Sequence, residues 1–348
     1  MKKHTLYLFV LSIVFAFNTQ GQSTAKDPLA YLEKVSDGQA KTSREFLGYI
    51  SAVSHGKSAR KVSQQRSELL SAVTASRARV SHLPDFQGDT SLRWAAYNYF
   101  NITYIVLKED YAKIMDLEEI SEQSYDNMEA YITMQKKASE KVKEAFDKCE
   151  KEFRAFAAKN NITLRDENTV ESKKMEKVGL VTNYYNNAYL PFFKCNKGEL
   201  YMVNAVSKKD LNALEQTKVA LQGYIEESTA KLNAIEPFEG DASMVNTSKK
   251  VLEFYQSEIK DKMPIVNDYI MKSEKFDKLK AAMDKKSPSE RTKEDIEQYN
   301  AAVNDMNAAS NNYNKAIGEM NNSRAKLINE WNKVANSFMD KHMPVYNH

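Results

Sequence analysis

Residues that commonly carry out chemistry are few in this sequence, and they do not form a recognised pattern. Beyond residue 21, histidine occurs only at positions 55, 82, 342 and 348, and none of these belongs to a His-x-x-x-His, Glu-x-x-His or His-Glu-x-x-His motif. A di-iron site in a helical bundle needs paired Glu-x-x-His motifs, which are absent. We therefore expect no metal site and no cofactor, and we interpret His342 and His348 as solvated residues of the tail.

Hydrolytic chemistry has no clear signature either. The sequence lacks a Gly-x-Ser-x-Gly elbow, and no histidine or basic cluster lies beside Cys149 or Cys195 to activate a thiolate. The 47 acidic residues could include a catalytic pair, but no pair can be selected from the sequence alone. The sequence thus favours a protein that is not an enzyme, and a hydrolase or lyase is the least favoured of three hypotheses.

The two cysteines leave two interpretations open. An even count permits one disulfide in an oxidising compartment. Cys149, however, shares an apolar helical stripe with Phe146, Phe153 and Phe156, where a free thiol packs as a small hydrophobic group. The sequence does not decide between a Cys149–Cys195 disulfide and two free thiols.

Aromatic residues form the densest local feature. One cluster contains Tyr184, Tyr185, Tyr189, Phe192 and Phe193. Exposed aromatic residues can bind proteins or sugars, so this cluster is a candidate partner-binding patch. The alternative is that these side chains fill the core and the junction between two bundles.

Two similar breaks between apolar segments indicate an internal repeat. One contains Gly88 and Asp89, the other Gly240 and Asp241, and Phe, Gly, Asp and Ser recur at an offset of 152 residues. A glycine permits the sharp turn and an aspartate caps the following helix, so we interpret these four residues as structural and not as ligands of a metal or phosphate. The recurrence predicts an ancient duplication.

The elements that carry these residues are predicted to be long helices. Only 10 glycines and 7 prolines occur in 348 residues, which allows few turns. Apolar residues between Ile296 and Phe338 follow steps of three and four, with polar interruptions at Ser310 and Arg324. We predict an all-α protein of two tandem halves that each resemble a four-helix bundle with long coiled-coil-like helices. The expected helices span residues 27–55, 58–83, 89–116, 118–160, 173–204, 207–235, 241–284 and 292–342.

The N-terminal segment predicts export. Lys2 and Lys3 precede the apolar run from Leu6 to Phe17, and a polar stretch follows, which is typical of a signal peptide. The expected cleavage is before Gln22, and no later segment is apolar enough to cross a membrane. Net charge is +3 for the whole chain and +1 without the two lysines, which gives no electrostatic footprint for nucleic acid.

The expected organisation is therefore a signal peptide (1–21), a first helical bundle (22–160), a linker (161–172) and a second helical bundle (173–348). The mature protein is expected in the periplasm or at the cell surface. The sequence does not distinguish these two places, and it does not indicate the oligomeric state.

A resemblance to a known family concerns mainly residues 180–344. The motifs that carry it are Tyr184-Tyr185-Asn186 through Phe192-Phe193-Lys194, Glu215-Gln216, Phe238-x-Gly240-Asp241, Phe254-Tyr255, Arg291-Thr292-Lys293-Glu294-Asp295 and Phe338-Met339-Asp340-Lys341-His342-Met343-Pro344. They resemble an uncharacterised family of exported bacterial surface proteins. The resemblance implies export and a surface or periplasmic place, and it implies no activity.

These observations favour a non-enzymatic binding or structural protein, with an unknown protein or glycan of the cell envelope as its partner. The second hypothesis is a protein that binds a small molecule or metal at the junction between the two bundles, a suggestion that rests on fold-level analogy alone.

Overall fold

The computed structural model describes residues 27–164 and 169–346. The predicted signal peptide lies outside these residues. Every regular element in the described ranges is a helix, and the only β-type pairing there consists of two isolated bridges, Phe86 with Asp89 and Phe238 with Asp241. The all-α prediction is confirmed. None of the described helices is both long enough and apolar enough to cross a membrane.

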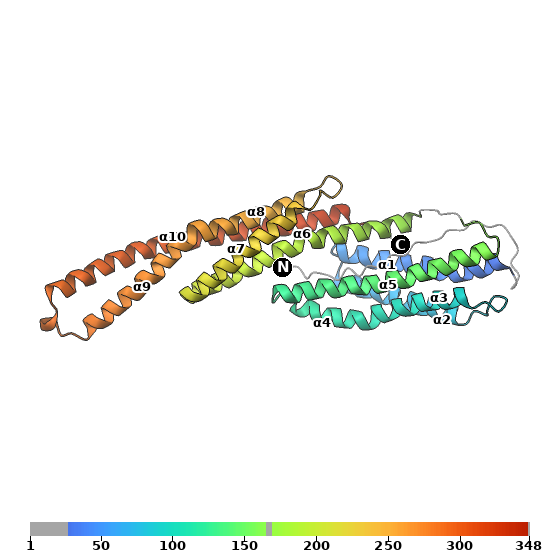
Figure 1. Ribbon diagram of the computed structural model, residues 1–348, viewed down its shortest axis with the longest axis horizontal. Helices are drawn as coiled ribbons and strands as arrows, with labels where there is room; N and C mark the ends of the chain where they lie inside the picture. The colour runs from blue at the N-terminus through green and yellow to red at the C-terminus, as the bar shows by residue number, and fades with distance from the viewer. Residues whose placement is uncertain (1–26, 165–168, 347–348) are drawn as a thin grey trace. The chain divides into compact units, whose positions relative to one another are not determined.

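The helices follow the predicted order closely (Figure 1). Two expected long helices, 89–116 and 241–284, each contain a five-residue π-helical segment that the sequence did not predict. The elements are α1 (Pro28–Ser54), α2 (Ala59–Ser81), α3 (Ser91–Ile105), η1 (Val106–Asp110), α4 (Tyr111–Ser121), α5 (Tyr125–Lys159), α6 (Val170–Ser207), α7 (Leu211–Asn233), α8 (Ser243–Ser257), η2 (Glu258–Lys262), α9 (Met263–Asp284), η3 (Pro288–Glu290) and α10 (Lys293–His342).

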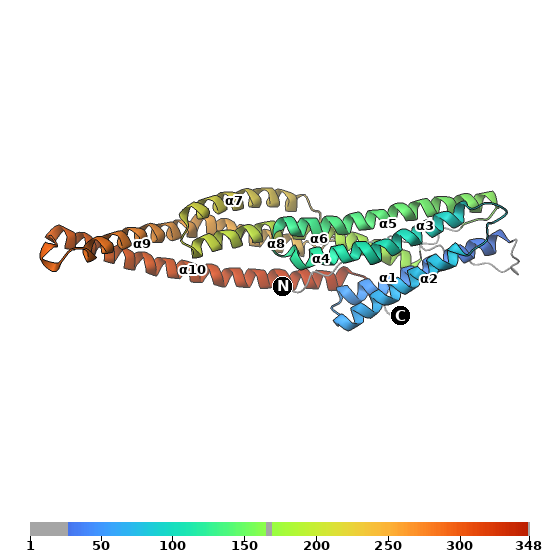
Figure 2. The same cartoon turned by 90° about the horizontal axis from the view of Figure 1, so that it is seen from below.

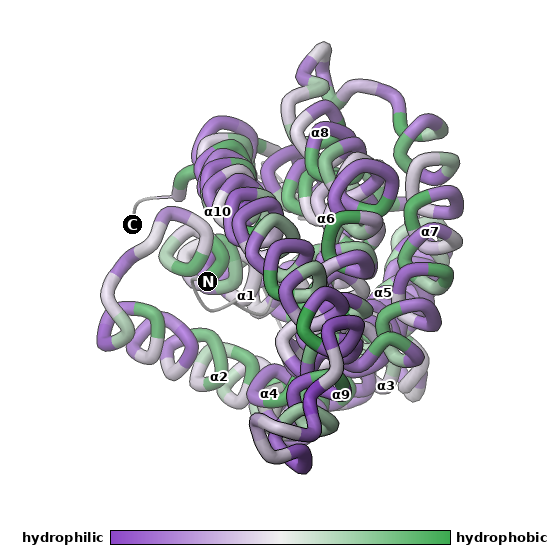
Figure 3. Tube along the Cα trace, turned by 90° about the vertical axis from the view of Figure 1, so that its left-hand side faces the viewer, coloured by the Kyte–Doolittle hydropathy of each residue, from purple (hydrophilic) through white to green (hydrophobic). Residues whose placement is uncertain are grey.

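Local sequence explains where the helices begin and end. Asp27 accepts a hydrogen bond from the Leu29 backbone N–H at 3.0 Å, and Pro28 occupies the first helical position of α1. Gly56, with φ +64°, follows the end of α1. At the start of α10, Thr292 Oγ1 accepts the Asp295 N–H at 3.1 Å. Hydrophilic and hydrophobic residues are mixed along the helices that face the viewer in Figure 3, such as α10 and α7.

The chain divides into two compact units. The first runs to Asn186 and also takes in the residues from Asn336 onward, and the second spans Asn187–Ala335. α6 and α10 therefore each contribute residues to both units.

The core of the first unit is aromatic. α1 packs on α2 and α5, α2 packs on α3, and both α3 and α4 pack on α5. Tyr99 of α3 meets Phe146 of α5 edge-on at 5.7 Å, and both side chains are fully buried. At one end Tyr31, Phe86 and Phe156 form a second cluster, with ring centroids between 5.1 and 5.5 Å apart. Such aromatic pairs add to the hydrophobic stabilisation of the bundle.

The second unit has its own core. Trp331 of α10 stacks on Phe192 of α6 at 4.1 Å and donates its indole N–H to the Ser248 hydroxyl of α8 at 3.0 Å. Tyr189 contacts the same indole at 5.6 Å. A buried tryptophan needs a partner for its N–H, and Ser248 provides one without opening the core to water.

One part of the second unit projects as a two-helix hairpin. The last buried residue of α9 is Ser273, and the first buried residue of α10 is Ala302. None of residues 274–301 is buried, and we call this segment the arm. Figures 1 and 2 both show α9 and α10 extending together beyond the turn between α6 and α7. Along this stretch the predicted seam of α10 is exposed at Ile296 and half-buried at Tyr299, because a single partner helix covers it.

Candidate functional site

The most unusual cluster of charged residues lies inside the second unit. The side chains of Glu199 in α6 and Glu258 in η2 are 0% exposed, and that of Arg324 in α10 is 16% exposed. Arg324 Nε donates to Glu199 Oε1 at 2.5 Å, and Arg324 Nη2 donates to Glu258 Oε1 at 2.9 Å. Nη1 donates to Asn321 Oδ1 at 2.7 Å. We call Glu199, Glu258 and Arg324 the acid–arginine trio.

The helical pattern of the sequence brings these charges into the core. In α6, Glu199 continues a buried stripe from Phe192 and Cys195 and is followed by Met202. The spacing of three and four residues places all four side chains on one helix face. In the α8–η2 segment, Glu258 likewise follows buried residues at positions 251 and 255.

The π-helical segment begins at Glu258. A π-turn inserts one extra residue and shifts the helical register, and such segments are frequent at functional sites. Tyr255, one turn before it, is fully buried, and its hydroxyl accepts a hydrogen bond from Asn196 Nδ2 at 2.8 Å. The polar groups of α6 and α8 therefore meet at the same level of the bundle as the trio.

Burial dominates the electrostatics of the trio. Desolvation and the neighbouring Glu199 carboxyl together raise the pKa of Glu258 to about 8, against the lowering effect of Arg324. Burial also raises the pKa of Glu199, against the opposing effect of Arg324. Burial and the two nearby carboxyl groups raise the pKa of the Tyr255 phenol. One arginine does not offset the cost of burying two ionised carboxylates.

A pocket of about 300 Å³ adjoins Glu258. Two other lining residues form an ion pair, with Lys262 Nζ 2.6 Å from Glu319 Oε2. The lining residues are Phe254, Ser257, Glu258, Lys262, Glu319, Met320 and Ser323. Because the Glu258 carboxyl is closed off from solvent, a molecule in this pocket would not reach it without a movement of the side chain.

The predicted aromatic cluster is mostly buried. Tyr184, Tyr189, Phe192 and Phe193 are at most 7% exposed, and Tyr185 is half-buried. Tyr184 belongs to the first unit and stacks on Phe338 at 5.1 Å. The structure thus places these side chains in the cores of the two units, and they do not form an exposed patch.

The glycine and aspartate residues of the two breaks have the same local geometry. Gly88 and Gly240 have φ values of +83° and +82°, a conformation that side chains with a Cβ rarely adopt. Asp89 Oδ1 accepts the Ser91 N–H at 3.0 Å, and Asp241 Oδ1 accepts the Ser243 N–H at 2.9 Å. These contacts are internal to the turns and helix starts.

Asp89 also pairs with Lys159 of α5 at 2.8 Å. Hydrogen bonds from Lys159 and Ser91 lower the pKa of Asp89 to about 2. The aspartate thus joins the turn to the end of α5 as well as to the start of α3.

Both cysteines are buried free thiols, which settles the alternative that the sequence left open. Burial raises the pKa of Cys149 to about 12 and that of Cys195 to about 11. His342 is 7% exposed and packs on Phe338 at 4.6 Å, so its interpretation as a solvated residue was wrong. His348 lies outside the described residues. Within residues 27–164 and 169–346, no group of three or more His, Cys, Asp or Glu residues could hold a metal ion.

Comparison of the chain with models of known families, with curated proteins and with solved structures finds no match in any of the three. The resemblance described above therefore stays a prediction. The trio was not predicted from the sequence. Its signal was the position of Arg324 on the apolar seam of α10, because a charge at a core position requires a buried partner on a neighbouring helix.

Proposed function

We propose that this chain is an exported helical protein that acts by binding a protein or glycan of the cell envelope, and that it is not an enzyme. The observation that carries the proposal is the arm, which presents two exposed helical faces beyond the core of the second unit. The basic and apolar N-terminal segment supports export, with cleavage before Gln22.

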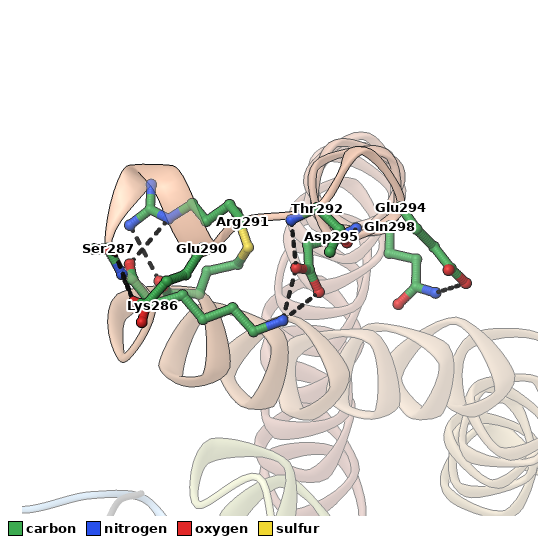
Figure 4. A network of polar contacts seen from close by, with 9 residues as sticks. Lys286, Ser287, Glu290, Arg291, Thr292, Glu294, Asp295 and Gln298 are labelled. Atoms are coloured by element: carbon green, nitrogen blue, oxygen red, sulfur yellow. Dashed lines mark hydrogen bonds and ion pairs between the residues drawn. The ribbon is translucent and has the colours of Figure 1, made fainter.

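The tip of the arm is well braced, which suits a surface that binds a partner (Figure 4). Lys286 Nζ donates to both carboxylate oxygens of Asp295, at 2.7 and 2.8 Å, and so joins the end of α9 to the start of α10. Arg291 donates to the backbone carbonyls of Met283 and Lys286 at 3.1 and 3.2 Å. A tip held in one conformation loses less conformational entropy on binding than a flexible loop would.

Aromatic contacts align the two helices of the arm and of its base. Tyr269 stacks on Tyr313 at 4.2 Å, and Phe276 lies 5.8 Å from Tyr299. Ile296 on the outer part of α10 is 45% exposed although it belongs to the predicted seam. An exposed apolar residue between charged neighbours is a suitable anchor for a partner.

The repeated element boundaries support a duplication of a four-helix unit. α2 and α7, α3 and α8, η1 and η2, and α4 and α9 begin 152 residues apart. The ends of α1 and α6 are 153 residues apart, as are the positive φ angles of Gly56 and Lys209. We infer that each half was originally one bundle of four helices and that the second acquired the longer final hairpin.

Site-specific photo-cross-linking in intact cells tests the binding proposal. A photoreactive amino acid replaces Ile296 in the arm, and the matched control replaces Val219 of α7, which is apolar and 65% exposed. We expect a discrete cross-linked protein or glycan from position 296 and none from 219. Equal labelling at both positions, or a bound small molecule in native mass spectrometry of the purified protein, would contradict the proposal.

Export has a separate test. The mature protein from the cell envelope should begin at Gln22, as read from its intact mass. A full-length mass in the cytoplasmic fraction would show that the N-terminal segment does not direct export.

A further inference from the structure

The acid–arginine trio has an unbalanced charge. With both carboxyl groups ionised, Glu199 and Glu258 carry two negative charges against one positive charge on Arg324. Arg324 occupies the Oε1 atom of each glutamate, whereas the two Oε2 atoms are buried and have no donor. A buried acceptor without a donor and a buried net charge are both costly.

We propose that Glu199 and Glu258 hold a single proton between their Oε2 atoms and that this proton makes the contact between α6, η2 and α10 pH-sensitive. With one proton bound, the trio is neutral and both remaining oxygens are hydrogen-bonded. When the proton is lost, a negative charge remains in the core and weakens the contact.

Geometry supports the shared proton. Both carboxyl groups bond to the one guanidinium of Arg324, at 2.5 and 2.9 Å, and the other oxygen of each is buried without a donor. A hydrogen bond between the two carboxyl groups requires one of them to be protonated. Carboxyl pairs that share a site in this way release their protons in two separated steps, because the two groups cannot both ionise at close range. The second proton is therefore retained to higher pH than the first.

The other groups near Glu258 do not supply the missing charge. In its own α8–η2 segment, Tyr255 accepts a hydrogen bond from Asn196, and Lys262 is paired with Glu319 of α10. Among the main causes of the pKa shift of Glu258, Arg324 is the one cation, and it lowers the pKa. A proton is therefore the available means of neutralising the trio.

The first half of the chain provides an internal comparison. At the offsets of 153 and 152 residues, Glu199 and Glu258 correspond to Phe46 and Val106. When the ends of the two halves are aligned by matching Phe156 with Phe338, Val142 corresponds in sequence to Arg324. Phe46, Val106 and Val142 are all buried and apolar. An apolar set thus suffices for packing, and buried ionic groups are often no more stabilising than such a set. We infer that the trio serves a role other than adding stability.

The pocket gives the ionised side chain a place to move. Glu258 lines it, so rotation of the carboxylate outward would bring it to water and toward Lys262. We call this outward rotation of the Glu258 carboxylate opening. Because the pKa of Glu258 is about 8 when the side chain is buried and 4.5 when it is solvated, opening is about tenfold more favourable at pH 9.5 than at pH 7.

Cysteine alkylation measures this opening in the full-length mature protein. Cys195 lies one helical turn before Glu199 in the second unit, and Cys149 in the first unit is the internal control. Both thiols are buried, and peptide mass spectrometry measures the rate of alkylation of each. We use the ratio of the alkylation rate at Cys195 to that at Cys149, because the effect of pH on thiolate formation is common to both thiols and cancels in this ratio.

We expect this ratio to rise about tenfold between pH 7 and pH 9.5 in the wild-type protein and to stay constant in Glu258→Gln. A second variant, Glu199→Phe/Glu258→Val/Arg324→Val, installs the residues of the first half and should also give a constant ratio. A constant ratio in the wild-type protein, or the same rise in either variant, would overturn the proposal. The test does not depend on whether the arm binds a partner.

Discussion

Replacement of Glu258 by glutamine should remove a specific part of the pH dependence of stability. Glutamine has nearly the same volume and can still donate a hydrogen bond, but it does not ionise. Folding raises the pKa of Glu258 from 4.5 to about 8, because the neutral acid is favoured in the core. Between these values the folded chain binds one proton more than the unfolded chain.

The sign of the effect follows from this difference. The contribution of Glu258 to the free energy of unfolding falls as pH rises from about 4.5 to about 8, by about 1.4 kcal/mol per pH unit. Outside that window this contribution does not change with pH. A pKa change from 4.5 to about 8 corresponds to a total on the order of 5 kcal/mol. The free energy of unfolding of the wild-type protein, relative to that of Glu258→Gln, should therefore be highest at the low-pH end of this range.

Urea unfolding at several pH values between 5 and 9 measures this slope. Trp331 is 2% exposed in the second unit, and Trp94 in the first is the other tryptophan. In a Trp94→Phe background, tryptophan emission thus reports the unfolding of the unit that contains Glu258. The difference in unfolding free energy between wild type and Glu258→Gln should fall steadily with pH. Parallel pH profiles would refute the shared proton, since every other titrating group is common to both proteins.

Three further predictions concern the backbone. Gly88→Ala should destabilise the folded protein by about 1 kcal/mol because alanine is strained at φ +83°. Gly318→Ala in α10 should stabilise it by about 0.5–1 kcal/mol, since the added Cβ meets no atom within 4 Å. Thermal unfolding of the two variants compares these effects. Gly38→Ala should cost about 1–3 kcal/mol, because its Cβ would lie 2.9 Å from Ser76 Cβ. In hydrogen exchange, amides of residues 277–300 should exchange faster than those of the buried part of α8 because no residue of the arm is buried, and equal protection would contradict this reasoning.

The helices could be predicted because their signals are local. Short-range signals mark where helices start and end and which face is apolar, without reference to distant residues. Examples are Asp27 and Pro28 at a helix start, Gly56 after a helix end, and apolar residues spaced by three and four. The two π-helical segments could not be predicted, because an inserted residue in a helix is stabilised by packing and by buried groups from other helices. Arg324 of α10, which donates to Glu258 at the start of η2, is such a group.

The candidate site was hidden for a related reason. Glu199 and Glu258 look like ordinary surface residues among 97 charged side chains, and only the packing of three helical segments brings them to Arg324. The aromatic cluster shows the opposite case, because its alternative interpretation as core is the one that agrees with the burial. Tyr189, Phe192 and Phe193 are conspicuous in the sequence, yet neighbouring helices of the second unit cover them.

The contrast between the two halves bears on why the trio exists. If the charged set were needed for folding, the corresponding positions Phe46, Val106 and Val142 would be expected to carry charges as well, and they carry none. Under the proposed duplication, one half kept or acquired an arrangement that costs desolvation free energy and returns little net stability. The triple apolar variant separates the two explanations. If it unfolds at a higher urea concentration and loses the pH slope, the trio serves as a pH-sensitive contact. If it fails to fold, the charges specify the register of α6, η2 and α10.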